Sequence, residues 1–421
     1  MTLLLVQMSL VLAVTLACGW LAQRLGQARV IGEIIGGIAL GPSLFSRFAP
    51  HAAGAILPPS SLGPFDTLSS VGLILFLFVI GTELNDASLR RHKGTATLAS
   101  VLSMLLPFSM ALVIAPALRV QFAPPGIPAL PFALLLGVAM SITAFPVLAR
   151  ILDERRMQST PLGSTALLCA AVDDVSAWTL LAVALTLLPH SGQMSGQPHG
   201  VGWNLLWLAA YIAAMIGLVR PMMAAVARRW QSSITLSYEM LGVVLVLLLL
   251  SAAATDAIGV HPLFGAFLAG LCFPRVAQWQ AGIKSRLEMV VSVLLLPFFF
   301  ALTGMRTRLD LLSGGRVWLW TAVILAVAIA GKIGGATLGV RFTGGTWRDG
   351  FALGALLNTR GLVELIVLNI AYKAGIFSPK LFSMMVIMAL VTTMMTTPLL
   401  NALHITGEEE SSPQEQADRA A

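Results

Sequence analysis

Two adjacent carboxylates, Asp173 and Asp174, lie inside an apolar stretch long enough to cross a membrane as a helix. An ionisable side chain at the middle of such a span costs at least about 2.5–3.5 kcal/mol on insertion, so a functional role is the default expectation. Neighbouring residues on a helix point about 100° apart. We therefore expect one acid to face a water-filled cavity and the other to face a neighbouring helix.

Lys332 is the only lysine deep within a predicted span. A buried ammonium needs a counter-charge, and Asp173 or Asp174 is the natural candidate for it. A static ion pair that specifies helix packing is the structural alternative. Two carboxylates and one lysine are, however, more charge than packing alone requires.

The polar segment from Thr143 to Pro146 predicts a helix break. Pro146 removes a helical hydrogen bond, and the residue before a proline avoids the α region. The freed carbonyls and amides would then face a cavity and could offer oxygen ligands to a cation. A simple proline kink is the alternative interpretation.

A second break is predicted from Asn358 to Gly361, mainly from an internal repeat because no proline is present. Arg360 in this segment could balance the negative carboxyl end of a half-helix. It could instead pair with Glu364, one turn further on, as a structural bridge. The sequence leaves these two interpretations open.

The composition identifies an integral membrane protein. Charged residues make up 11% of the 421 residues and hydrophobic residues 57%, whereas soluble domains carry about 25% charged residues. The net charge of +7 is better explained by basic cytoplasmic loops than by a nucleic-acid partner. The three cysteines are scattered in apolar segments, which argues against a disulfide framework or a metal cluster.

About 13 transmembrane helices are predicted if each span takes about 20 apolar residues. The spans lie near residues 2–22, 30–45, 65–83, 95–118, 130–151, 160–188, 203–226, 234–256, 260–274, 285–303, 316–342, 350–374 and 379–404. An odd number places the ends on opposite sides, and most loop Lys and Arg residues fall on one side, which predicts the amino end outside and the carboxyl end in the cytoplasm. Residues 405–421 are expected to form a short, disordered acidic tail.

An internal repeat is indicated by three correspondences that keep their order along the chain. They are Gly36–Gly41 with Gly265–Gly270, Phe76–Gly81 with Phe299–Gly304, and Thr143–Pro146 with Asn358–Gly361. Spans 1–6 and 8–13 would be two inverted copies joined by span 7, an architecture in which transporters place their binding site at the repeat interface.

These segments together resemble the monovalent cation/proton antiporters of the sodium/hydrogen exchanger family. The resemblance rests on residues 141–150, 170–174 and 358–365, with support from 30–42 and 265–270. It covers about residues 1–404 and is closest to the bacterial and plant cation/H+ exchanger branch. It implies an all-α core domain with two crossed, discontinuous helices, and a dimerisation domain.

The resemblance also implies domain boundaries and a location. The core would comprise about residues 95–188 and 316–404, the dimerisation domain about 1–83 and 234–303, and a linker helix about 203–226. The protein would be a homodimer in the bacterial inner membrane, and it would be neither an enzyme nor dependent on a cofactor.

Residue by residue, the resemblance assigns Asp174 as the ion-binding carboxylate, Asp173 as the partner of Lys332, and Thr143 to the helix crossing. The branch usually carries Asn where this chain has Asp173, and an acid pair with a lysine looks like the electrogenic sodium/proton members. The choice among Na+, K+ and Li+ and the stoichiometry therefore stay open. So do the roles of Glu33 and Trp178, for which packing is the simpler expectation.

The expected activity is exchange of a monovalent cation for protons. A cation and a proton would compete for Asp174, and the core would move like an elevator. A channel-like K+ efflux protein is the main alternative, since it would carry cations without obligatory proton counterflow. An intramembrane aspartyl protease is disfavoured because adjacent acids diverge on a helix, whereas such proteases bring two separate helices to one water.

Overall fold

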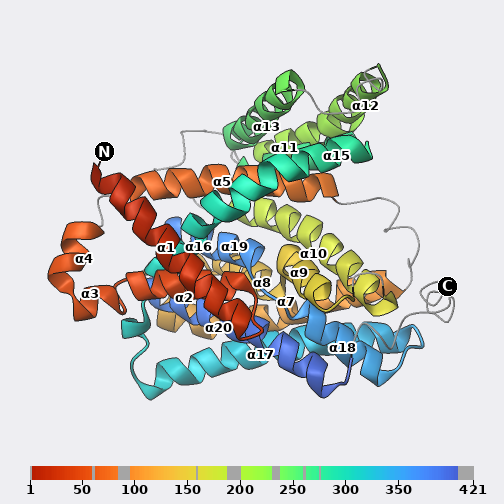
Figure 1. Ribbon diagram of the computed structural model, residues 1–421. Helices are drawn as coiled ribbons and strands as arrows, with labels where there is room; N and C mark the ends of the chain where they lie inside the picture. Colours follow the sequence, from red (N-terminus) through yellow and green to blue (C-terminus); the bar gives the residue numbers. More distant parts are fainter. Residues whose placement is uncertain are drawn as a thin grey trace, which may run out of the picture. The chain divides into compact units, whose positions relative to one another are not determined.

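The computed structural model describes residues 2–58, 62–83, 95–157, 160–186, 201–229, 238–258, 262–274 and 276–405, and these are helical apart from short connections (Figure 1). A helix pairs its backbone N–H and C=O groups within itself, and this is required in a bilayer because lipid tails offer no hydrogen-bond partners. Within the described ranges, nine helices are long and apolar enough to cross a membrane. The all-helical membrane fold is thus confirmed, while the predicted number of 13 spans stays a prediction.

The chain divides into two compact units. The first comprises Met1–Leu12, Gly54–Asn85 and Ala182–Leu302, and the second comprises Ala13–Ala53, Asp86–Leu181 and Thr303–Ala421. The helices of the amino-terminal half are α1 (Thr2–Arg24), α2 (Arg29–Leu40), α3 (Phe45–Phe48), α4 (Pro50–Ile56), α5 (Gly63–Glu83), α7 (Thr95–Phe122), α8 (Ala129–Ser141), α9 (Phe145–Glu154) and α10 (Pro161–Thr186). Those of the other half are α11 (Val201–Ala214), α12 (Arg220–Arg229), α13 (Tyr238–Ile258), α14 (Pro262–Cys272), α15 (Ala277–Ile283), α16 (Leu296–Arg306), α17 (Gly315–Phe342), α18 (Trp347–Leu357), α19 (Leu362–Lys373) and α20 (Pro379–Ala402).

In the first unit, α5 and α14 pack with their backbones in contact at two glycines. A Cβ atom at Gly81 would lie 2.5 Å from the Phe267 carbonyl oxygen, and one at Gly270 would lie 2.3 Å from the Phe78 carbonyl oxygen. Lipid supplies no hydrophobic drive between helices, so close approach through small residues is a principal source of packing energy. Any larger side chain at either glycine would separate the two helices.

In the second unit, α7 packs along α17 through a glycine stripe. Cβ atoms at Gly331, Gly335 and Gly339 would each lie within 2.6 Å of an α7 backbone atom, whereas one at Gly334 would meet only the Leu106 side chain at 3.6 Å. The stripe therefore defines the face of α17 that contacts α7. Because Lys332 directly follows Gly331, this packing holds Lys332 at a fixed depth and rotation.

The second unit also repeats the glycine contact of the first. A Cβ atom at Gly304 would lie 2.3 Å from the Ile34 carbonyl oxygen on α2. Gly81 thus packs on the glycine-rich helix α14, and Gly304 packs on the glycine-rich helix α2. Each of the two segments that the sequence pairs as equivalents contacts the glycine-rich helix of the other copy, as an internal repeat requires.

Two helices of the second unit are interrupted. The first stops at Ser141 and resumes at Phe145, and the second stops at Leu357 and resumes at Leu362. The discontinuous helices expected near 130–151 and 350–374 are therefore present. Pro146 is the second residue of α9, within the first turn where the missing backbone N–H is tolerated.

Candidate functional site

Asp173 lies on α10 and is fully buried in the second unit. Its Oδ1 atom accepts a hydrogen bond from the Ser100 hydroxyl of α7 at 2.9 Å. Its Oδ2 atom lies 2.7 Å from the Thr143 hydroxyl and 2.8 Å from Lys332 Nζ. Both carboxylate oxygens are thus engaged by groups from other segments of the chain.

Lys332 is also fully buried, and its Nζ atom donates to both Asp173 Oδ2 and Thr143 Oγ1, the latter at 2.6 Å. The structure pairs Lys332 with Asp173, one of the two candidates that the sequence leaves open. Withdrawing two charges from water costs several kcal/mol of solvation free energy for each ion. Their mutual attraction offsets this cost only if the two groups are in good geometry and their remaining hydrogen bonds are made. Here the Lys332 ammonium contacts the Asp173 carboxylate and the Thr143 hydroxyl, and the carboxylate also contacts the Ser100 and Thr143 hydroxyls.

Thr143 connects the two helix interruptions. Its hydroxyl lies 2.9 Å from the Leu357 carbonyl oxygen at the end of α18, and it is buried. The next backbone amide, that of Ala144, donates to the Thr359 carbonyl at 2.9 Å. The two interruptions therefore cross with one backbone–backbone hydrogen bond and one side-chain–backbone contact between them.

The second interruption is held by α20. The Thr393 hydroxyl accepts from the Arg360 backbone N–H at 2.9 Å and lies 2.7 Å from the Arg360 carbonyl oxygen. Backbone groups outside a helix need such partners when they are buried. Thr393 thereby supplies the contacts that the missing helical turn would have supplied.

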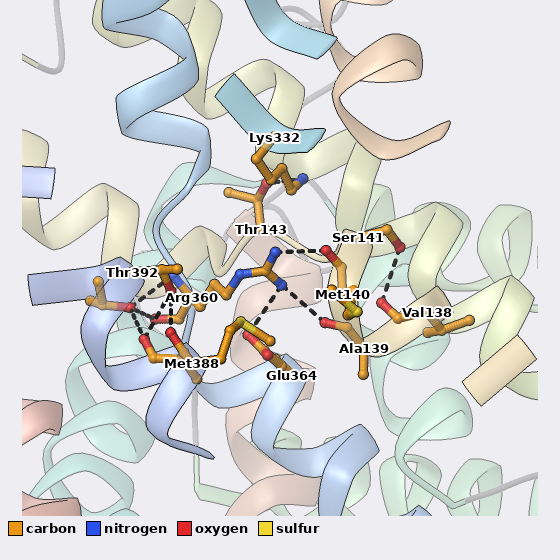
Figure 2. A network of polar contacts seen from close by, with 12 residues as sticks. Val138, Ala139, Met140, Ser141, Thr143, Lys332, Arg360, Glu364, Met388 and Thr392 are labelled. Carbon is orange, nitrogen blue, oxygen red and sulfur yellow. Dashed lines mark hydrogen bonds and ion pairs between the residues drawn. The ribbon is translucent and has the colours of Figure 1, made fainter. Parts of the chain in front are cut away.

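Arg360 lies across the end of the first half-helix (Figure 2). Its Nη1 and Nη2 atoms donate to the carbonyl oxygens of Ala139 and Met140 at 3.0 and 2.6 Å. These carbonyls belong to the last turn of α8, where the helix dipole concentrates negative charge. The guanidinium therefore balances the carboxyl end of α8, which belongs to the other interrupted helix rather than to its own.

Arg360 also forms an ion pair with Glu364 on α19, with 3.4 Å between Nη1 and Oε2 (Figure 2). Both side chains are buried. The two interpretations of Arg360 thus coexist, since one guanidinium contacts the α8 carbonyls and the carboxylate together. Glu364 stands in the first turn of α19, where a carboxylate is favoured by the positive end of the helix dipole.

The remaining predicted residues are placed as follows. Asn358 and Gly361 lie within the second interruption and are buried. The side chains of Asp174, Trp178 and Pro146 lie outside the described part of the structure. Glu33 on α2 is buried and pairs with Arg29 at 2.8 Å.

Ser100 and Thr393 are site residues that the sequence reasoning missed. Each is one of several hydroxyl residues in its helix, and such residues commonly bond to a carbonyl of their own helix. What distinguishes these two hydroxyls from the others is the packing of α7 against α10, which brings Ser100 to Asp173, and of α20 against the second interruption, which brings Thr393 to Arg360. The run of threonines from 392 to 397 is the one signal in the sequence that could have drawn attention to α20.

The geometry suits a small cation or a proton more than a transition metal. The described residues hold no group of three or more His, Cys, Asp or Glu side chains that could bind a metal ion. They do bring carboxylates, hydroxyls and half-helix ends to one place, and transporters bind monovalent ions with such groups.

Comparisons with known proteins identify the relatives of this chain. The family model described as the transmembrane sodium/hydrogen exchanger matches residues 11–402. Na(+)/H(+) antiporter NhaS4 of Synechocystis sp. is 39% identical over 402 residues, which cover 95% of this chain and 97% of that protein. Cation/H(+) antiporter 17 of Arabidopsis thaliana is 39% identical over 96% of this chain and 49% of its own length.

K(+)/H(+) antiporter 1 of Saccharomyces cerevisiae is 33% identical over 90% of this chain and 44% of its own length. The chain thus spans nearly all of the cyanobacterial relative but about half the length of the plant and yeast relatives. Among solved structures, the sodium proton antiporter MjNhaP1 of Methanocaldococcus jannaschii matches with a TM-score of 0.69 over 94% of this chain and 95% of that one. At 15% identity, this similarity concerns the fold alone.

Proposed function

Since the chain belongs to the sodium/hydrogen exchanger family, we propose that it exchanges a monovalent cation for protons across the membrane by alternating access. Na+ and K+ are the first candidates for the cation, because relatives carry both names, and Li+ is a third. The observation that carries the proposal is the buried Asp173–Lys332 pair at the crossing of two interrupted helices. Such charge inside a membrane protein is expected where ions or protons move.

Asp174 is the proposed exchange site. It is a second carboxylate on α10, directly beside an acid that is already paired. A cation would bind only when Asp174 is deprotonated, and a proton would bind only after the cation has left. If the loaded forms cross and the empty charged form does not, this competition produces obligatory exchange.

Asp173 and Lys332 are proposed to move a second charge. Cation entry beside Asp174 would weaken the attraction between Asp173 and Lys332, and Lys332 would then release a proton. Transport would be electrogenic in that case. Replacing Lys332 with Gln should lower the current carried per cation, and an unchanged current per cation would remove this step from the mechanism.

The movement is proposed to be of the elevator type in a homodimer. Residues of about 95–188 and 316–404 would carry the site, and residues of about 1–83 and 234–303 would form the dimerising scaffold. The family resemblance of the sequence supports this division. The asymmetry of Lys and Arg in the loops supports an orientation with the amino end outside, and the family resemblance supports the bacterial inner membrane as the location.

The proposal is tested with purified protein in liposomes that hold a preset pH gradient and an internal pH dye. Na+, K+ and Li+ are added in turn. We expect at least one of them to trigger proton movement, and the Asp174→Asn variant to abolish it. Asp256→Asn is the matched control, because Asp256 lies exposed near the end of α13 and should transport normally.

Competition at one carboxylate also predicts a pH dependence. Where protons occupy most of the sites, a tenfold rise in proton concentration should raise the apparent KM for the cation by up to about tenfold and leave the maximal rate unchanged. An apparent KM that does not depend on pH would exclude a shared site. Cation flux without proton movement would instead indicate the channel-like alternative.

A further inference from the structure

Asn358 has a fully buried side chain with no hydrogen-bond partner among the residues that the structure describes. Its exposed fraction is 0%, and neither its amide nitrogen Nδ2 nor its amide oxygen Oδ1 is bonded to another described group. A primary amide offers two donors and an acceptor with two lone pairs. Large polar groups left entirely unpaired are rare in protein interiors, and each such group calls for a specific explanation.

The position of Asn358 is fixed from both sides. The Thr143 hydroxyl contacts the carbonyl oxygen of Leu357, the residue before it. The Ala144 amide donates to the carbonyl oxygen of Thr359, the residue after it. Asn358 is therefore the one residue of the second interruption that is flanked by both contacts of the crossing, one from a side chain and one from the backbone, and Thr143 links this segment to the Asp173–Lys332 pair.

The neighbouring hydroxyls do not share this condition, although Arg360 Nε and the two Glu364 carboxylate oxygens also lack a hydrogen bond among the described groups. The Thr359 hydroxyl donates to the Leu356 carbonyl at 2.6 Å, and Thr393 is bonded to both backbone groups of Arg360. The fold thus satisfies the hydroxyls that stabilise this interruption and leaves the Asn358 amide unpaired. A residue that served only the structure of the break would be expected to bond to the break.

The chemistry of the amide points to its oxygen as the functional atom. A neutral carbonyl oxygen is a good ligand for a hard monovalent or divalent cation, and it does not carry a charge that a proton would neutralise. A cation that leaves water for a buried site needs several such oxygens in place of its hydration shell. A carboxylate alone does not supply them.

We propose that the Asn358 amide oxygen is a direct ligand of the transported monovalent cation at the crossing of the two interrupted helices. This inference rests on the proposed exchange function and adds to it a neutral ligand that binds the cation without binding the proton. Loss of this ligand should therefore weaken cation binding selectively. Proton binding at the carboxylates should persist.

The first test compares Asn358→Leu with Thr359→Val in the liposome assay, with Na+, K+ and Li+ each as the chloride. A lost contact to a charged group should raise the apparent KM for the transported cation roughly tenfold to a hundredfold in Asn358→Leu. Thr359→Val should leave the apparent KM within about twofold, because its hydroxyl already bonds within its own helix end. Asn358→Asp keeps an oxygen ligand and should transport at an apparent KM closer to that of the unmodified protein.

The second test measures cation binding without transport, as the rise in thermal unfolding temperature when the same chloride salts replace choline chloride in detergent. Asn358→Leu should unfold at a higher temperature than the unmodified protein in choline chloride, since it replaces an unpaired buried amide with an apolar group. Its rise on adding the cation should be smaller. If the leucine does not fold, Asn358→Ala carries the same comparison.

An apparent KM and a cation-induced stabilisation that are both unchanged in Asn358→Leu would overturn the assignment, while loss of exchange in Asp174→Asn would leave the proposed function standing. Absence of exchange in the unmodified protein would overturn the proposed function, and the thermal measurement would still report whether Asn358 binds a cation. A KM that rises equally in Thr359→Val would overturn the assignment in favour of a general effect on the break.

Discussion

Removal of Lys332 should expose how strongly the buried ion pair is coupled. In Lys332→Met, Asp173 would keep its hydrogen bonds from Ser100 and Thr143 at 2.9 and 2.7 Å but lose the ammonium at 2.8 Å. Both ionic side chains are 0% exposed, so water cannot replace the lost charge. Breaking such a pair on one side costs about 3–5 kcal/mol, and the two remaining hydroxyls place the expected loss near the lower value, about 3 kcal/mol.

The double variant Asp173→Asn/Lys332→Met removes both charges together. It should recover most of the lost stability, because a pair of matched neutral groups carries no uncompensated charge. A double-mutant cycle over the two single variants and the double variant should then give a coupling energy of about 2–3 kcal/mol. The free energy of unfolding is measured by equilibrium titration with a denaturing detergent in mixed micelles.

Lys373→Met is the matched control, because Lys373 lies exposed at the end of α19, and it should change the free energy of unfolding by less than about 0.5 kcal/mol. A coupling energy for Asp173 and Lys332 below about 0.5 kcal/mol would refute the reasoning. It would mean that, in mixed micelles, the two charges are separated or hydrated and do not form a buried ion pair.

Three further substitutions test the framework around the site. Gly335→Ala should destabilise the protein by about 1–3 kcal/mol, because its Cβ would lie 2.3 Å from the Leu102 carbonyl oxygen. Gly334→Ala should be neutral, because its Cβ would meet only the Leu106 side chain. The two variants are compared by thermal unfolding, and equal effects would contradict the role of the glycine stripe. Arg360→Lys keeps the charge but loses the fork that contacts two α8 carbonyls, so a loss of about 1–3 kcal/mol and a lower maximal transport rate are expected. Thr393→Val removes the hydroxyl that contacts the Arg360 backbone amide and carbonyl, so it should lower the free energy of unfolding by about 1–3 kcal/mol. The apparent KM for the cation should be unchanged, and an altered KM with normal stability would count against a purely structural role.

Much of the architecture follows from local properties of the chain. The length of the apolar stretches and the shortage of charge are enough to identify a polytopic helical membrane protein, because a bilayer admits few alternatives. The helix interruption before Pro146 follows from the covalent geometry of proline. The second interruption carries no such mark and is predicted mainly through the repeat, and it begins at Asn358, where the repeat places it.

Other features depend on how helices are rotated and staggered against each other. Hydropathy predicts a membrane span near residues 260–274, but α14, the helix found there, has only 11 residues. A window average does not distinguish a short buried helix from part of a full span. The contact of Gly304 with α2 joins residues about 270 positions apart. Nothing local in either segment specifies that contact.

The sequence by itself predicted that two acids and one lysine lie within membrane spans and that two interrupted helices accompany them. Only the tertiary structure decided that Asp173 contacts Lys332. Adjacent residues of a helix diverge by about 100°, so the choice depends on the rotation of α10 against α17, which packing sets. In the same way, only the crossing of the two interruptions brings Arg360 to the end of α8 and buries the Asn358 amide without a hydrogen bond to any described group.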